Sequence, residues 1–284
     1  MIFPMLLAIS LLLTSCGRTE GPAKTPDGVA QRIISVVPSA TEMLLAFGIA
    51  DRLIAVGDYD QVPAEFGDKP RIGGLLNPNI EKIIEYRPDL VITYGSQESL
   101  EQRLGALGIQ VHAYTHGDVE QTLGYMTELG GLVGREEQAN EIVGRIRETF
   151  AQVQMSRPAV PPKVFLVHNR AVGTLGAFYS VGARAFQHQL IEMAGGQNIF
   201  GDVDKEVVQP SLEEIIKRAP DVIIETLPSR TPIAEVEARI ADWQKLAKLP
   251  AVLNKQVLVT TEDYMLVPGP GLALTARKFA EILQ

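Results

Sequence analysis

The four histidines are the side chains best suited to metal binding or acid–base catalysis, and their spacing favours neither role. They are His112, His116, His168 and His188, spread over both halves of the chain. A zinc site needs three or four converging ligands, but the first two histidines straddle the end of a predicted strand and share no helical face. No G-x-S-x-G, H-E-x-x-H, P-loop or G-x-G-x-x-G pattern occurs. The sequence therefore predicts a protein that is not an enzyme and has no resident metal or cofactor.

Two acidic motifs predict the starts of two helices. Ser39 and Glu42 fit the S-x-x-E pattern of a capping box, in which the serine and glutamate side chains each bind the other residue's backbone N–H. Ser211 and Glu214 fit the same pattern in the second half of the chain. This second motif leaves the adjacent Glu213 without a capping role, so its charge is free for another partner.

The elements that position these residues follow from seven short apolar runs. They lie at 33–37, 53–57, 89–94, 109–114, 163–168, 221–226 and 256–260, separated by helical patterns. Continuous apolar strands that alternate with helices indicate mainly parallel sheets covered on both faces. The predicted fold class is α/β, with Rossmann-like units.

The two halves of the chain share a pattern. Residues 77–92, NPNIEKIIEYRPDLVI, align without a gap with residues 209–224, QPSLEEIIKRAPDVII. In this alignment Glu81 matches Glu213, and each segment predicts a capped helix that ends before a proline and leads into a buried strand. Two similar lobes that face each other predict a ligand cleft between them.

A single long helix is predicted to join the lobes. Over residues 135–158, apolar residues recur at the spacing of one helical face, and Pro158 ends the pattern. We therefore expect an N-terminal lobe over 32–134, an interlobe helix over 135–158 and a C-terminal lobe over 159–284. One stiff connector predicts modest motion of the lobes.

The N-terminus predicts export. Residues 1–15 are apolar but too short to span a bilayer, as in a secretory signal peptide, although they contain no Lys or Arg. Leu13–Cys16 resembles the lipobox of bacterial lipoproteins, which implies a lipidated Cys16 on a tether over 16–31 and a membrane-anchored, periplasmic or extracytoplasmic protein. Cys16 is the only cysteine, so internal disulfides are excluded.

Charge argues against one class of partner. The net charge of −8 and the pI near 5.2 do not suit nucleic acid, which needs a basic surface.

Residues 32–63 and 72–92 resemble the periplasmic binding proteins of ABC importers for cobalamin, ferric siderophores and haem, most of all the cobalamin-binding subgroup. AGGQNIF (194–200), QPSLEEII (209–216) and TTEDYMLVPGP (260–270) extend the likeness in the same order. The resemblance implies two α/β lobes bridged by one helix, with the ligand in the cleft. It also implies delivery to an ABC permease dimer driven by its ATPase, by a receptor that is monomeric when free.

In such a protein the loops that follow the strands line the cleft, as the rule for open α/β sheets requires. Tyr59 and the Asp263–Tyr264 pair also match positions where cobalamin binders carry an aromatic and an Asp–aromatic pair. The candidate ligand contacts are Pro38, Ser39, Asp58, Tyr59, Gly74, Leu75, Tyr94, Gln97, Asn169, Phe178, Tyr179, Asp263 and Tyr264.

Ligand chemistry ranks the alternatives. Cobalamin is flat and rich in amides, so aromatic faces and a few hydrogen-bonding groups suit it. Ferric catecholates would need clustered bases, and Arg170 is the only one near these loops. Haem would need an axial Tyr or His, for which Tyr59 and His168 are candidates. Cobalamin leads; a siderophore or haem receptor is the alternative, ahead of a zinc or manganese receptor and an exported α/β hydrolase.

The same resemblance implies that one acidic residue at the top of each lobe pairs with arginines of the permease. We expect Glu42 and Glu213 to be these docking residues, with Glu42 also serving as a cap.

Overall fold

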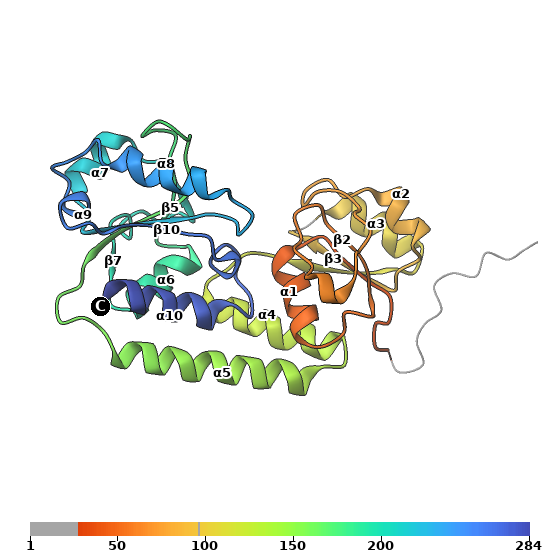
Figure 1. Ribbon diagram of the computed structural model, residues 1–284. Helices are drawn as coiled ribbons and strands as arrows, with labels where there is room; N and C mark the ends of the chain where they lie inside the picture. Colours follow the sequence, from red (N-terminus) through yellow and green to blue (C-terminus); the bar gives the residue numbers. More distant parts are fainter. Residues whose placement is uncertain (1–27, 96) are drawn as a thin grey trace, which may run out of the picture.

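The N-terminal lobe is built on a four-stranded sheet in the order β2-β1-β3-β4, in which every neighbouring pair is parallel. The computed structural model describes residues 28–95 and 97–284, and Figure 1 shows this lobe beside a second one. The elements of the lobe are β1 (Ile33–Ser35), α1 (Pro38–Ala46), β2 (Leu53–Val56), the 3₁₀ turn η1 (Ala64–Phe66), α2 (Ile80–Glu85), β3 (Leu90–Tyr94), α3 (Glu98–Ala106) and β4 (Gln110–Tyr114). Strand β1 is buried throughout, as its continuous apolar run predicted.

The C-terminal lobe has a six-stranded sheet in the order β10-β9-β5-β6-β8, with β7 also paired to β5. The strands are β5 (Lys163–Asn169), β6 (Tyr179–Val181), β7 (Gln197–Asn198), β8 (Val207–Val208), β9 (Val222–Thr226) and β10 (Val257–Thr260). The pairs among β10, β9, β5 and β7 are parallel, whereas β6 pairs antiparallel with β5 and β8. The predicted α/β class with mainly parallel sheets is therefore confirmed.

The last helix of the N-terminal lobe, the helix that connects the lobes and the helices of the C-terminal lobe complete the fold. They are α4 (Val119–Leu132), α5 (Glu136–Met155), α6 (Phe186–Met193), α7 (Leu212–Arg218), α8 (Ile233–Trp243), α9 (Pro250–Leu253), the 3₁₀ turn η2 (Asp263–Met265) and α10 (Leu272–Leu283). Helix α5 has 20 residues, about 30 Å at 1.5 Å per residue. Figure 1 shows it running beneath both lobes, and it packs against α4 and α10.

One hydrophobic core continues from the N-terminal lobe through α5 into the C-terminal lobe. It includes Ile34 of the first sheet, Phe150 of α5 and Phe279 of α10, together with Leu166 and Ile224 of the second sheet. A separate cluster of buried aromatic residues covers the other face of the second sheet, around Trp243. The two lobes therefore share buried surface.

The predicted capping box at Ser39 and Glu42 is wrong. Helix α1 has Val37 as its N-cap and Pro38 at its first position, and it has no side-chain cap. Proline suits the first helical position because its missing N–H would have had no partner there. Ser39 therefore lies inside the helix. The second predicted box is confirmed, since Ser211 Oγ accepts from Glu214 N at 3.2 Å and Glu214 Oε2 accepts from Ser211 N at 2.9 Å.

Cys16, the signal segment and most of the tether lie outside the described residues. Within the described ranges, no helix has the length and apolarity needed to cross a membrane.

Candidate functional site

Two pockets lie where the lobes face each other. The first, which we call the α1 pocket, has a volume of about 690 Å³. Its wall combines Glu42 and Leu45 of α1 and residues 60–63 with Ser229, Arg230 and η2 of the other lobe. The second, the β-end pocket, has a volume of about 520 Å³ and lies at the carboxyl ends of β5 and β9, with His116 of the N-terminal lobe in its wall. Both volumes fall within the usual range for small-molecule sites.

Three polar contacts join the lobes. Gln61 Nε2 donates to Asp263 Oδ1 at 3.2 Å, and the backbone N–H of Val119 donates to Gln189 Oε1 at 2.9 Å. His116 Nδ1 lies 3.3 Å from Glu206 Oε1. A ligand that enters the cleft therefore meets side chains from both lobes.

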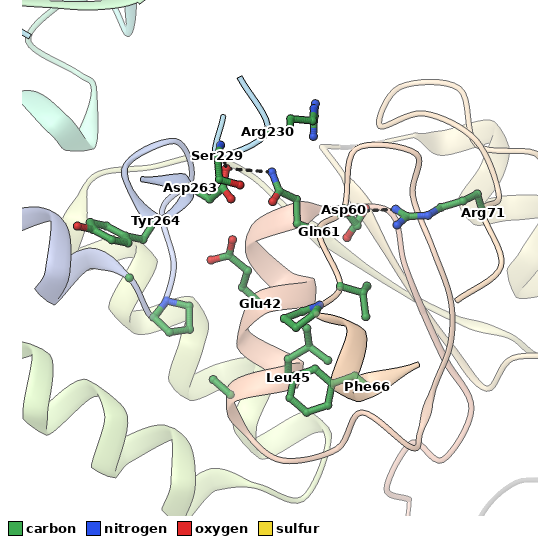
Figure 2. A pocket seen from close by; sticks show the side chains of 15 residues that line it. Glu42, Leu45, Asp60, Gln61, Phe66, Arg71, Ser229, Arg230, Asp263 and Tyr264 are labelled. Atoms are coloured by element: carbon green, nitrogen blue, oxygen red, sulfur yellow. Dashed lines mark hydrogen bonds between the residues drawn. The ribbon is translucent and has the colours of Figure 1, made fainter. Parts of the chain in front are cut away.

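The α1 pocket is lined by three carboxyl groups from three different elements. Figure 2 shows Glu42 pointing from α1 toward the segment that carries Asp263 and Tyr264. Burial, followed by the charges of Asp263 and Asp60, raises the pKa of Glu42 to about 8. Asp263 is held in place because its Oδ1 also accepts from the backbone N–H of Ser229 at 2.9 Å.

Asp60 is the most deeply buried of these acids, with 4% of its surface exposed. Neither of its carboxyl oxygens has a hydrogen-bond partner among the described residues. Arg71 Nη1 donates instead to the backbone oxygens of Asp60, at 2.6 Å, and Gly57, at 2.7 Å. Burial raises the pKa of Asp60 to about 7, although Thr41 and Arg71 act in the opposite direction.

The β-end pocket contains a histidine of fixed orientation. His168 Nδ1 lies 3.0 Å from Thr226 Oγ1, and this hydroxyl donates to the backbone oxygen of Val167 at 3.4 Å. The Gln187 side chain is a second hydrogen-bonding neighbour of the ring. Burial lowers the pKa of His168 to about 4, so the ring is neutral at pH 7.

The profile of the periplasmic binding protein family matches residues 33–264 of this chain. The chain belongs to this family. Its members bind substrates for transport and are not classed as enzymes. In the described part of this periplasmic binding protein, no group of three or more His, Cys, Asp or Glu residues is arranged to hold a metal ion.

Proteins that are named for the ligand they bind align with most of this chain. The vitamin B12-binding protein of Yersinia pestis (strain Pestoides F) is 27% identical over 289 residues, covering 99% of this chain and 94% of that protein. The structure of the periplasmic vitamin B12-binding protein BtuF of Vibrio cholerae matches with a TM-score of 0.73 at 24% identity, covering 89% of this chain and 96% of that one. The periplasmic heme-binding protein HutB of Vibrio cholerae matches with a TM-score of 0.77 at 23% identity, covering 89% and 98%. These two structural matches support the fold.

The predicted ligand contacts fall into three groups in this periplasmic binding protein. Asp263 and Tyr264 line the α1 pocket, and Asn169 lines the β-end pocket. Most of the others lie exposed or half-buried at the carboxyl edges of the sheets, outside both pockets: Pro38, Asp58, Tyr59, Leu75, Tyr94, Gln97 and Tyr179. Gly74 is buried, and a Cβ atom at this position would lie 3.6 Å from Tyr59 Cε2, so the glycine lies next to the tyrosine ring.

Two predicted contacts are buried away from both pockets. Phe178 is 1% exposed, and its ring packs on Phe165 and Trp243 in the aromatic cluster of the C-terminal lobe, which leaves no face for a ligand. Ser39 is also 1% exposed, inside α1. Arg170, which we considered as a base near the cleft, is buried and bonded to Glu225 at 2.7 Å and to Asp242 at 2.9 Å, so its charge is already paired.

Sequence reasoning missed several residues that line the pockets. Ser229 and Arg230 follow β9, so the rule that selected loops after strands would have found them had it been applied to this strand. His116 lies two residues after β4, and Asp60 lies next to the predicted Tyr59. Glu206 precedes β8, a strand of two residues that is too short to predict, and no sequence signal marks it.

Glu42 does not suit the predicted docking role. Its side chain is half-buried and points into the α1 pocket, whereas a docking residue must lie on the outer surface. Glu213 is exposed in the first turn of α7, and Glu81 is exposed at the matching position of α2. The N-caps Asn79 and Ser211 occupy equivalent places, because each accepts from the N–H three residues later.

Proposed function

We propose that this periplasmic binding protein is an extracytoplasmic receptor that binds cobalamin or a related corrinoid between its lobes and delivers it to an ABC importer. The observation that carries the proposal is a B12-binding relative that covers 99% of the chain at 27% identity. The polarity of the cleft supports it. The α1 pocket presents carboxyl groups, which suit the amides of a corrinoid better than the carboxylates of haem or of many siderophores.

Haem is the second candidate, and His168 is the observation that favours it. A neutral imidazole in the pocket wall, with Nδ1 held next to Thr226, is a suitable kind of ligand for the metal of a planar chelate. Tyr59 is 70% exposed, so its hydroxyl is accessible to a ligand.

Titration of a chain that lacks the first 21 residues tests both candidates. Cyanocobalamin, cobinamide, haemin, a ferric hydroxamate and a ferric catecholate would be compared by calorimetry at pH 7. We expect a corrinoid to bind with a Kd in the micromolar range or below, and Tyr264→Ala to weaken it about tenfold or more. Met155→Ala, at an 89% exposed residue far along α5, is the matched control. Absence of corrinoid binding at tens of micromolar would exclude the proposal.

We further propose that Glu81 and Glu213 dock onto the permease, in place of the pair Glu42 and Glu213. Each is exposed at the second position of a helix, at the same place in the two related lobes. A lipid on Cys16 would hold the receptor near the membrane, and the free receptor would be a monomer.

Charge reversal tests the docking pair. The double variant Glu81→Lys, Glu213→Lys is expected to keep ligand affinity and thermal stability but to lose most of its transport in a reconstituted system, because each lysine would repel a basic partner. Glu237→Lys, on the exposed face of α8, is the control for added charge. Normal transport by the double variant would exclude this assignment.

A further inference from the structure

The α1 pocket contains an unusual pair of acids for a cleft that must hold a large polar ligand. Asp60 is 4% exposed, lines the pocket, and has two carboxyl oxygens without a partner among the described residues. Glu42 faces it from α1, and the backbone of Gly269 comes close from the opposite lobe, where an added Cβ would lie 3.3 Å from Glu42 Oε2. Glu42 therefore presents a carboxyl group to the pocket, and the unpartnered carboxyl group of Asp60 is buried near it.

The bases of the pocket do not neutralise this pair. The charged and titratable groups that face Glu42 come from the loops around β2, from the loop after β9 and from η2: Asp60, Arg71, Arg230, Asp263 and Tyr264. Arg71 Nη1 is committed to the backbone oxygens of Gly57 and Asp60. The Arg230 side chain points away from Glu42 in Figure 2.

Under these conditions the carboxyl groups of Glu42 and Asp60 retain protons near neutral pH. Burial comes first among the causes that raise the pKa of Glu42 to about 8 and that of Asp60 to about 7. An un-ionised carboxyl group has one O–H donor and one carbonyl acceptor. A primary amide has the complementary carbonyl and N–H₂, so the two groups can form a pair of hydrogen bonds.

We propose that Glu42, supported by Asp60, forms a subsite that pairs with a primary amide on the ligand and rejects a carboxylate at the same place. The inference rests on the proposed function, because it concerns the amide-bearing rim of a corrinoid. A ligand carboxylate would place an unpaired negative charge beside Glu42, Asp60 and Asp263, which is costly in a buried setting. The subsite would therefore discriminate among corrinoids that differ in a single side chain, and against haem propionates.

Single-side-chain analogues of cyanocobalamin test the discrimination. The receptor would be titrated at pH 7 with cyanocobalamin and with each of its propionamide monocarboxylates. One monocarboxylate is expected to bind at least about tenfold more weakly than the parent in the native receptor. The difference is expected to shrink in Glu42→Lys, where the lysine can pair with the carboxylate. Equal affinity for the parent and every monocarboxylate would overturn the inference.

The pH dependence provides the second readout. Affinity for cyanocobalamin is expected to be highest below pH 7 and to fall about tenfold per pH unit above pH 8, as Glu42 loses its proton. Glu42→Gln, a neutral isostere that can pair with an amide, is expected to keep the affinity at pH 7 and to flatten the loss above pH 8. Glu42→Ala is expected to weaken binding at both pH values. Glu85→Gln, at an exposed residue of α2, is the control.

The outcomes separate the two proposals. If no corrinoid binds, the proposed function fails and the subsite fails with it. If corrinoids bind but Glu42→Gln leaves the pH profile unchanged, or weakens binding at pH 7 as much as Glu42→Ala, only the amide subsite is excluded. Circular dichroism of each variant at pH 7 and 9 shows whether a change in binding reflects a loss of fold.

Discussion

Asp60 also affects the stability of the fold, because its carboxyl group is buried without a hydrogen-bond partner among the described residues. Its pKa is about 7 in the folded protein against an ordinary value of 3.8. Stability from this group is fully present below pH 3.8 and is lost as the pH rises toward 7, because the unfolded chain releases the proton first. The loss amounts to at most roughly 4 kcal/mol at 1.36 kcal/mol per pKa unit.

We predict that Asp60→Asn raises the free energy of unfolding at pH 8 by about 1 to 3 kcal/mol and has little effect at pH 4. Asparagine keeps the shape of the side chain but removes the charge. Urea denaturation at the two pH values measures the difference. Asp68→Asn, at an exposed position, is the control and should change the free energy of unfolding equally at both pH values. A more stable native protein than variant at pH 8 would show that Asp60 is charged and paired when folded.

At the residue scale, sequence reasoning located the loops better than the side chains within them. Asp58 and Tyr59, two predicted ligand contacts, are exposed outside both pockets, but Asp60, which forms part of the α1 pocket, is buried. Phe178 and Tyr179 differ in the same way, since one is 1% and the other 44% exposed. Neighbouring residues of an extended segment point in opposite directions. Which of the two faces a ligand depends on packing contacts that the sequence does not reveal.

At the scale of elements, the capping pattern alone did not predict where each helix begins. Helices α1 and α7 both carry S-x-x-E, but only Ser211 is an N-cap. Pro38 shifts the start of α1 one residue before Ser39, because proline fits the first helical position. By contrast, α5 was predictable from its apolar periodicity; it begins one residue after the predicted start and ends at Met155, before the predicted end at residue 158.

We predict that Ser211→Ala and Ser39→Ala change the free energy of unfolding by different amounts or in opposite directions. Ser211→Ala removes a cap from α7 and should lower the free energy of unfolding by about 1 kcal/mol. Ser39→Ala removes a buried hydroxyl without a hydrogen-bond partner among the described residues, so stability should be unchanged or slightly higher. Urea denaturation of both variants under one condition makes the comparison. A larger loss for Ser39→Ala would restore a capping role to Ser39.

At the scale of the whole molecule, the two lobes are joined by packing as well as by a connector. The main core runs from the first sheet through α5 and α10 to the second sheet, and three polar contacts cross the cleft. Such continuity limits independent motion of the lobes. The repeat of segment 77–92 at 209–224 predicted two lobes, but not that one core would connect them, because that depends on how α5 and α10 pack.

Cooperative unfolding tests this connection. Trp243 is the only tryptophan in the sequence and is buried in the C-terminal lobe, so its fluorescence reports on that lobe alone. Far-UV circular dichroism reports on the helices and strands of both lobes. Because the core is continuous, we predict that the two probes give the same midpoint and the same slope in a urea titration. Phe150→Ala, in the part of α5 that joins the core, should lower the free energy of unfolding by about 3 to 5 kcal/mol, so that both midpoints move down together. Separate midpoints in the native protein would mean that the lobes unfold independently and that α5 acts only as a tether.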